Sequence, residues 1–309
     1  MTYTYPAPAP TVTDGDTASI HHLLKTPSVL ARRIRTLADK RYIADMLLTG
    51  RYQANGGAIL YEDGEPMETN DDPEAIAPGA AYPLTKANEG TLQVAKTTKW
   101  GRDVIVTDEA IARLLMDPVD RAFAKLVNRT VRFIDTAALS VIASRVTATF
   151  DVTTDGPGAW TGGDEIVESV LLAKQRVVDL EEGYDPTAIV LTGTQWAKAV
   201  SRLNAAGLLP REGGNPLTSG TWPQALGLTW LTSPHTPSTD PMLLDTTQLG
   251  GMADEQIGGP GYISERGVGV ETKSLRDDDN DRYKLRARRV TVPVVREAAA
   301  GIKITNTGL

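Results

Sequence analysis

The sequence predicts an α+β fold. Three observations lead to this prediction: a helical pattern of nearly thirty residues in the first half, a buried helix–strand–helix unit after it, and a series of strands in the last third. The helix–strand–helix unit alone fits either an α+β or an α/β protein. The strand-rich end, together with the long helix, favours the α+β class.

The composition excludes several classes of protein. The chain has 309 residues, of which 41% are hydrophobic and 23% are charged, as in ordinary soluble globular proteins. It has no cysteine, which excludes disulfides, thiolate nucleophiles and iron–sulfur clusters, and it has only three histidines. No apolar run approaches the ~18 residues of a membrane span, and the first residues lack the basic-then-apolar order of a signal peptide. We therefore expect a protein that stays in its compartment and does not contact a membrane.

The net charge of −7 is concentrated in one segment. Residues 61–80 contain seven carboxylates and no basic residue, so the rest of the chain is neutral. Such a run is usually a solvated loop. Its flanks, 58–61 and 91–95, have strand patterns, with Leu92, Val94 and Trp100 on one parity. A ribbon of this length is not stable alone in water, so we expect it to lie on a partner's surface.

The elements before and after the ribbon follow in order. A Pro-rich arm precedes a helical pattern over 28–48, which Gly50 is expected to end. After the ribbon, 103–107 is predicted to be a buried strand, and Thr107 or Asp108 is predicted to cap a short helix that reaches residue 116.

The longest helix is predicted to begin at Asp117-Pro118, where an N-cap residue is followed by a favourable proline. Its apolar periodicity continues to Arg145. The span from Arg121 to Arg145 contains five basic residues and only one acidic residue, Asp135. A basic helix face of this kind could lie against nucleic acid, although for any single cation a solvated position is more common.

The second half alternates between compact and extended patterns. After the glycine-rich break at 156–163, helices are predicted over 164–182 and 195–203, the second capped by Thr194, with a buried strand at 187–192 between them. Strands are predicted at 242–245, 261–264, 267–272, 281–295 and 302–305.

No motif for catalysis or cofactor binding is present. Phosphate-binding glycine loops, the dinucleotide-binding fingerprint and the serine nucleophile elbow are all absent. The run 277–281 resembles a calcium loop, but Arg282 stands where such a loop requires glycine, so we interpret it as an acidic turn between two strands. We predict no catalytic, cofactor-binding or metal-binding residue, and no enzymatic activity.

The order of arm, long hairpin, long helix, compact unit and long strands resembles that of tailed-bacteriophage major capsid proteins with the Hong Kong 97 fold. The run Asp185-Pro-Thr-Ala-Ile-Val-Leu-Thr-Gly-Thr-Gln-Trp196, followed by Ala205-Ala-Gly207 and Leu208, is similar to a strand–turn–helix of that family. Leu226–Leu231 and Asp281–Val290 look like two other recurring pieces. The resemblance covers essentially the whole chain.

The resemblance implies a Hong Kong 97-type capsid fold with an N-terminal arm, an extended β-hairpin loop, a long spine helix, and peripheral and axial domains. The expected boundaries are 1–50 for the arm and leading helix, 51–103 for the extended loop, 104–163 for the peripheral domain with its spine helix, 164–262 for the axial domain, and 263–309 for the return strands of the peripheral domain.

The same resemblance implies a structural protein that assembles as hexamers and pentamers into an icosahedral shell around double-stranded DNA, bound without sequence specificity. A separate scaffolding protein and a portal are the other implied partners. The implied location is the virion, after assembly in the host cytoplasm. The residues expected between subunits are Glu62, Asp63, Glu65, Glu68, Asp71, Asp72 and Trp100, and those expected to face DNA are Arg121, Lys125, Arg129 and Arg132.

Two alternatives stay open at this stage. The first is an encapsulin-like cellular compartment shell, which shares the fold; the Pro-rich arm in place of an N-terminal helix argues against it. The second is a cytoplasmic α+β enzyme with a site that the sequence does not reveal.

Overall fold

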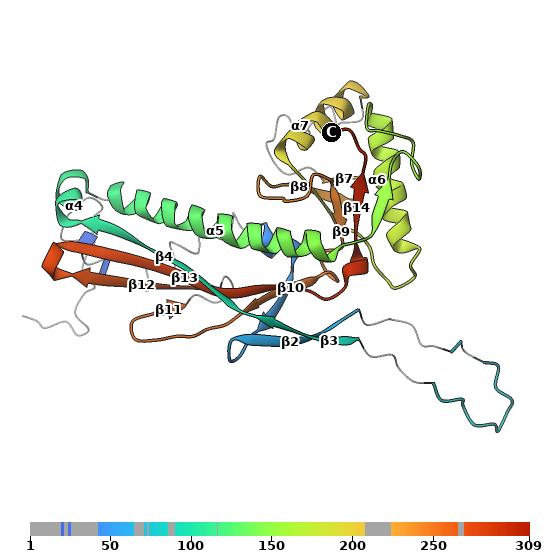
Figure 1. The fold of residues 1–309 in the computed structure, drawn as a ribbon, viewed down its shortest axis with the longest axis horizontal. Helices are drawn as coiled ribbons and strands as arrows, with labels where there is room; N and C mark the ends of the chain where they lie inside the picture. The colour runs from blue at the N-terminus through green and yellow to red at the C-terminus, as the bar shows by residue number, and fades with distance from the viewer. Residues whose placement is uncertain are drawn as a thin grey trace, which may run out of the picture. The chain divides into compact units, whose positions relative to one another are not determined.

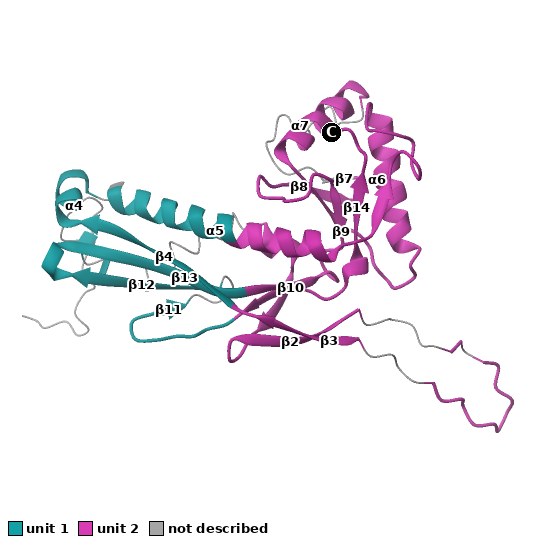
Figure 2. Ribbon diagram, in the orientation of Figure 1, with its two compact units in different colours: residues 1–41, 98–133, 255–291 teal, residues 42–97, 134–254, 292–309 magenta. Residues whose placement is uncertain are grey.

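The computed structural model describes residues 20–21, 24–25, 43–64, 71–72, 74–85, 90–115, 117–207, 224–264 and 269–309. The chain divides into two compact units (Figure 2). Unit 1 comprises residues 1–41, 98–133 and 255–291, and unit 2 comprises residues 42–97, 134–254 and 292–309.

Unit 1 is built on a sheet in which four strands lie in the order β4, β13, β12, β11 (Figure 1). All three pairings are antiparallel, and the part of β13 in this unit pairs with β4 from Arg282↔Thr107 to Thr291↔Thr98. The short helix α4 follows β4 directly, and Thr107 caps it by accepting a hydrogen bond from the Ala110 N–H at 3.3 Å. The bounds are Thr98–Thr107 for β4, Asp108–Leu114 for α4, Ile263–Ser264 for β11, Val270–Asp277 for β12, Asp278–Asn280 for the 3₁₀ turn η1 and Arg282–Val295 for β13.

The long helix α5 spans Asp117–Arg145, as its apolar periodicity predicts. Its buried residues recur three and four positions apart, from Val119 through Phe123, Leu126 and Val127 to Ile142. This spacing gives the helix one apolar stripe and leaves an exposed polar face. Both α5 and β13 begin in unit 1 and end in unit 2.

Unit 2 contains a second sheet in the order β5, β14, β9, β6, β8, β7. Helices α6 and α7 contact each other and cover a core that includes Trp160 and Trp230, both almost completely buried. The ring of Trp196 packs against Trp230 with centroids 5.7 Å apart. The bounds are Thr149–Asp151 for β5, Gly163–Val178 for α6, Ala188–Leu191 for β6, Gly193–Ala205 for α7, Gln224–Ala225 for β7, Leu228–Thr232 for β8, Met242–Leu244 for β9, Ala298–Ala300 for η2 and Gly301–Thr305 for β14.

The rest of unit 2 includes the helix α3, a parallel strand pair and a hairpin. Strand β1 pairs with β10 at Gly50↔Gly251, where a Cβ on Gly251 would lie 2.3 Å from the Gly50 carbonyl oxygen, so only glycine fits. The hairpin strands β2 and β3 pair antiparallel from Ala58↔Lys96 to Asp63↔Thr91. The bounds are Ala44–Leu47 for α3, Gly50–Gln53 for β1, Ala58–Asp63 for β2, Thr91–Lys96 for β3 and Gly250–Asp254 for β10.

Several element ends differ from the sequence-based predictions. Helix α6 ends at Val178 rather than residue 182, and Glu181 and Gly183 then both have positive φ. Helix α7 is capped by Thr192 rather than Thr194, in a capping box with Gln195. The helix expected over 28–48 falls mostly outside the described residues, and the described helical segment there ends at Leu47.

The acidic run 277–281 forms the predicted turn between β12 and β13. The carboxylate of Asp277 accepts hydrogen bonds from Arg282 and Asn280 and forms an ion pair with Lys284. Among the residues that the structure describes, no group of three or more histidine or carboxylate side chains is placed to hold a metal ion. None of the described helices is both long enough and apolar enough to span a membrane.

Candidate assembly surfaces

The hairpin of β2 and β3 has two different faces. Ile59, Tyr61 and Ala95 pack against a small core formed by Ala54, Ala253 and Val294. On the opposite, exposed face, Leu60 and Val94 are cross-strand partners and Leu92 lies diagonal to Leu60, while Glu62 is the cross-strand partner of Leu92. The three apolar side chains are 59%, 62% and 59% exposed, respectively. We call Leu60, Leu92 and Val94 the exposed hairpin face.

The sequence predicted that Leu92 and Val94 share a face, and the alternation in β3 confirms this. Trp100, expected on the same parity, lies in β4 instead, beyond a break between the strands at Thr97. Its ring is partly buried and stacks on Phe133 of α5, with centroids 6.0 Å apart and planes 22° apart. Leu60 was not singled out from the sequence, although the same alternation places it opposite Val94.

The end of the hairpin is held to α5 and to the segment after β13 by two polar contacts. Asp63 forms an ion pair and a hydrogen bond with Arg145 at the end of α5. The N–H of Gly64 donates to the carbonyl of Arg296 at 3.0 Å. Asp63 thus already has a partner inside the chain, whereas its neighbour Glu62 is exposed.

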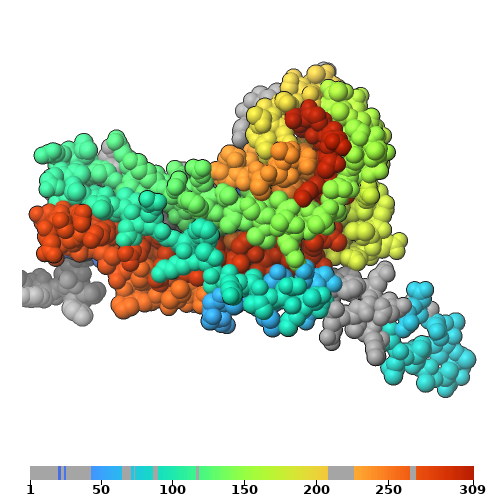
Figure 3. All heavy atoms as spheres, in the orientation of Figure 1, coloured from blue at the N-terminus to red at the C-terminus, as the bar shows by residue number. Residues whose placement is uncertain are grey.

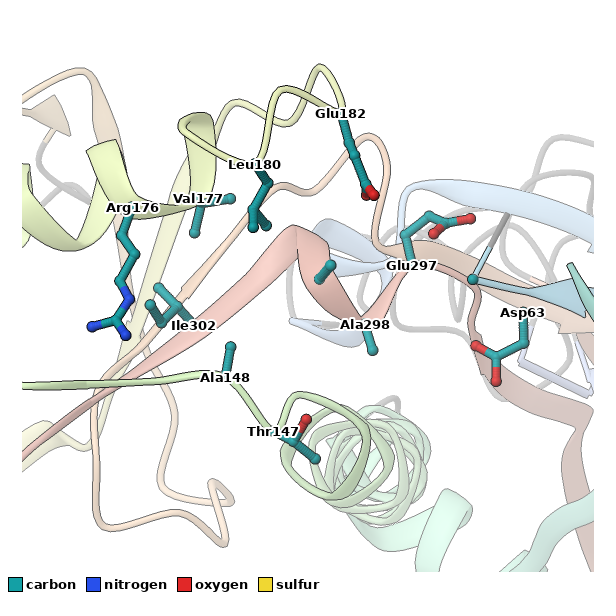
Figure 4. Close-up of a pocket in the computed structure, with 12 residues that line it drawn as sticks. Asp63, Thr147, Ala148, Arg176, Val177, Leu180, Glu182, Glu297, Ala298 and Ile302 are labelled. Atoms are coloured by element: carbon teal, nitrogen blue, oxygen red, sulfur yellow. The ribbon is translucent and has the colours of Figure 1, made fainter. Parts of the chain in front are cut away.

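A cleft of about 550 Å³ opens beside this anchor (Figure 4). Val177, Leu180 and Ile302 line one side together with Arg176, and Glu182 and Glu297 lie on the other side. The buried Tyr184 hydroxyl donates to Glu297 at 3.1 Å; burial, followed by the hydrogen bond to Glu182, raises the pKa of Tyr184 and keeps this donor protonated. Because Asp63 and Glu297 have internal partners, we interpret the cleft as a structural feature at the base of the loop that follows β2.

The acidic residues predicted at the loop are placed as follows. Asp71 and Asp72 are exposed, as is Glu74, in a segment that extends beyond the ends of β2 and β3 (Figure 3). Tyr82 and Leu84, at 81% and 99% exposed, lie in the same segment. Glu65 and Glu68 lie outside the described residues. The described loop therefore exposes three carboxylates and two large apolar side chains.

The four basic residues predicted to face DNA are all exposed and lie in unit 1 on the polar side of α5. Their spacing, from Arg121 through Lys125 and Arg129 to Arg132, keeps them on one stripe of the helix. The guanidinium of Arg129 lies 4.8 Å from the centre of the Phe133 ring. Asp135, the one carboxylate of this stretch, is buried.

A second basic surface, not identified from the sequence, lies on the β4–β13 sheet of unit 1. A cleft of about 450 Å³ is lined by Lys99, Gly101, Arg102, Asp103, Tyr262, Arg286 and Arg288. Sequence reasoning missed it because its cations come from two strands almost two hundred residues apart, and only the strand register brings them together.

Comparison with known proteins identifies the family. A family model described as phage capsid protein matches residues 91–304, which is more than half of the chain. The chain belongs to the phage capsid protein family. It is accordingly a structural protein of the virion that assembles with copies of itself into a capsid shell. A comparison with curated proteins found no match for this capsid protein.

Solved structures with low sequence identity share the fold of this capsid protein. The capsid of cyanophage P-SCSP1u matches with a TM-score of 0.59 at 12% identity, covering 85% of this chain and 87% of that one. A phage-related protein from Bordetella bronchiseptica matches with a TM-score of 0.57 at 14% identity, covering 90% and 97%. An encapsulin from Synechococcus elongatus matches with a TM-score of 0.51 at 15% identity, covering 86% and 87%. The predicted Hong Kong 97-type fold is confirmed.

Proposed function

We propose that this capsid protein assembles as hexamers and pentamers into an icosahedral shell that encloses double-stranded DNA. The single observation that best supports assembly through the hairpin is its exposed face. Leu60, Leu92 and Val94 form a continuous apolar strip on a two-stranded ribbon, and burial of each such side chain contributes about 1.5–3 kcal/mol. A neighbouring copy would cover this strip.

The domain division that the resemblance implies is part of the proposal. Residues 1–50 would form the arm and leading helix, 51–103 the extended loop, 104–163 and 263–309 the peripheral domain with α5 as spine helix, and 164–262 the axial domain. The two compact units differ from these domains, because they divide α5 and β13 between them. Glu62, Glu65, Glu68, Asp71 and Asp72, with the exposed edge of Trp100, are the proposed subunit contacts. Asp63 would contribute by holding the loop to Arg145.

The exposed basic stripe on α5 supports the proposal that the shell packages DNA. Arg121, Lys125, Arg129 and Arg132 place four cations on one side of the helix, and cations in such an array bind phosphates without reading sequence. A scaffolding protein and a portal are the other proposed partners, and the host cytoplasm is the proposed place of assembly. An encapsulin-type shell shares the fold but would enclose protein cargo instead of DNA.

Electron microscopy of the purified chain, with and without scaffold and double-stranded DNA, tests this function. Closed particles with hexameric and pentameric units would support it, and a chain that stays monomeric at high concentration under both conditions would refute it. DNA binding is tested with the variant that combines Lys125→Gln and Arg129→Gln. We expect normal particles whose DNA affinity falls less steeply with salt, by a slope of about 2. Arg113→Gln, an exposed basic residue on α4, is the control.

A further inference from the structure

The turn between β1 and β2 contains an asparagine followed by a glycine. Asn55 and Gly56 form the only such pair in the sequence, and both residues are exposed. Gly56 and Gly57 have φ values of 67° and 84°, as the two central residues of a type I′ turn require. A Cβ on Gly56 would meet nothing within 4 Å. Since glycine also lacks a Cβ of its own, no side chain shields its backbone nitrogen from the Asn55 carboxamide.

Neither of these two groups is held by a hydrogen bond. The Asn55 carboxamide and the Gly56 N–H have no hydrogen-bond partner among the residues that the structure describes. The N–H of Asn55, by contrast, donates to the carbonyl of Ala58 at 3.3 Å. A peptide nitrogen must lose its proton before it can attack a carbonyl carbon, and an exposed N–H without an acceptor loses it most readily.

The other described asparagines lack this combination. Asn128 and Asn204 lie within α5 and α7, where the following N–H donates along the helix. The carboxamides of Asn280 and Asn306 each donate to an aspartate, at 3.1 and 2.7 Å. Each of the four is followed by a residue with a side chain. Among the described asparagines, Asn55 therefore has the most accessible neighbouring nitrogen.

We propose that Asn55 is a site of spontaneous deamidation, which needs no enzyme and loosens the base of the hairpin. The Gly56 nitrogen attacks the Asn55 Cγ, the side-chain nitrogen leaves with the proton as ammonia, and a cyclic imide forms. Water then opens the imide at either carbonyl carbon, which gives an ordinary aspartate or an isoaspartate whose main chain runs through the former side chain. Overall, water is consumed and ammonia is released, with no oxidant or reductant. The reaction belongs to the single chain and does not depend on the proposed assembly.

An isoaspartate at this position affects the start of β2. It lengthens the main chain by one carbon atom and adds a carboxylate. Both ends of the turn are fixed, because Ala54 is only 2% exposed and the Thr97 N–H donates to the Gly57 carbonyl at 2.9 Å. The turn itself must accommodate the extra atom. The bridge between Asn55 and Ala58 is the contact that we expect to be lost first.

Mass spectrometry of peptides from the incubated full chain tests the modification. We expect a gain of about 1 Da at Asn55, or about 3 Da in water labelled with heavy oxygen, and faster conversion at mildly alkaline pH. The rate should lie within about fivefold of that in the urea-unfolded chain, because the turn gives no protection. Asn55→Gln should show no change in mass at this position. Slower conversion in the folded chain would overturn the proposal.

The hairpin itself provides an internal comparison. Asp63 and Gly64 can form the same imide, but Asp63 is paired with Arg145 and the Gly64 N–H donates to the Arg296 carbonyl at 3.0 Å. We expect isoaspartate at this position in the unfolded chain only. Equal conversion at Asp63 in the folded and unfolded chains would show that these contacts do not control the reaction, which removes the basis for singling out Asn55.

Hydrogen exchange tests the effect on the hairpin. Converted and unconverted chains differ in charge and can be separated by ion exchange. The amides at the start of β2 should exchange at least about tenfold faster in the isoaspartate chain, while those of α5 stay unchanged. Freshly prepared Asn55→Asp carries the added charge without the added carbon atom and should exchange like the unmodified chain. Equal exchange in all three chains would refute the loosening, and equally fast exchange in Asn55→Asp would assign it to charge alone, against the proposal.

Discussion

Asp135 shows how a single charge can have a structural role that its sequence context does not suggest. It is the only acidic residue between Arg121 and Arg145, and its side chain is only 2% exposed. Its carboxylate accepts hydrogen bonds from the N–H groups of Ala44 at 3.0 Å and Ile43 at 3.4 Å. These are orphan donors at the start of α3, which has no side-chain cap of its own.

Asp135→Ala should therefore destabilise unit 2 without affecting the exposed surfaces. Removing the carboxylate leaves two buried or partly buried donors unsatisfied, and we expect the free energy of unfolding to fall by about 3 kcal/mol. Urea denaturation measures this change. Ser140→Ala, at an exposed position on the same helix, should change it by less than about 0.5 kcal/mol. Similar effects of the two variants would show that Asp135 does not cap α3.

A second residue-scale prediction concerns acid stability of the sheet in unit 1. Hydrogen bonds from Arg286 and Arg276 lower the pKa values of Asp103 and Asp108 below their ordinary value of 3.8. A lowered pKa in the folded state gives stabilisation that is complete above 3.8 and is lost as the pH falls from there through the folded-state pKa. The stability of unit 1 should accordingly be insensitive to these groups near neutral pH and decline in acid.

This pH dependence is checked by measuring the free energy of unfolding of Asp103→Asn and of the unmodified chain by denaturation from about pH 6 to about pH 2.5. The variant should be less stable near neutral pH and should lose less stability on acidification. An unchanged slope in acid would mean that the Asp103–Arg286 pair persists in the unfolded chain or contributes nothing.

At the scale of the element, the hairpin combines an internal and an external role. Serine at Leu60 or Val94 should leave folding almost unchanged, because these side chains are already in water, but should weaken assembly. Serine at Ile59, on the opposite face, should reduce stability, since that side chain packs on the core around Ala253 and Val294. Thermal unfolding and particle yield separate the two effects. Equal losses of stability on both faces would contradict the assignment of the exposed face.

The elements also show what sequence patterns can and cannot predict. The bounds of α5 followed from periodicity, because one side of this helix is apolar over many residues. The hairpin strands begin where the sequence predicts, but β2 ends two residues later and β3 one residue later than expected. The end of α6 did not follow from the sequence, because Gly183 suggested a stop while the chain leaves the helix at Asp179 and leaves Leu180 49% exposed. The Thr192 cap could have been predicted, since Thr192 and Gln195 have capping-box spacing.

At the scale of the whole molecule, the order of elements was enough to predict the fold and the family, but not the contacts between distant segments. The basic cleft needs Lys99 and Arg286 on neighbouring strands, and the cap of α3 needs Asp135 beside Ala44. Both depend on strand register and helix packing, which periodicity does not specify. The acidic segment was visible because its charges are consecutive in the chain.

The structure gives a sharper way to separate assembly from folding than removal of the whole ribbon. Deleting residues 58–96 would uncover the small core of Ala54, Ala253 and Val294, so a loss of assembly could reflect unfolding. Replacing residues 71–85 with a short Gly-Ser linker keeps both strands and their packing. We expect this variant to unfold at the same temperature as the unmodified chain and to form no particles, because it lacks Asp71 and Asp72, two of the proposed subunit contacts.

Calorimetry and electron microscopy of the same preparations measure both outcomes, with the 58–96 deletion as the destabilised comparison. The charge is local, because the seven carboxylates of residues 61–80 account for the entire net charge of −7. The linker variant removes three of these carboxylates, Asp71, Asp72 and Glu74. If it still forms normal particles, these three charges are not needed for assembly. That outcome would leave the exposed hairpin face of Leu60, Leu92 and Val94 as the contact that holds neighbouring copies together.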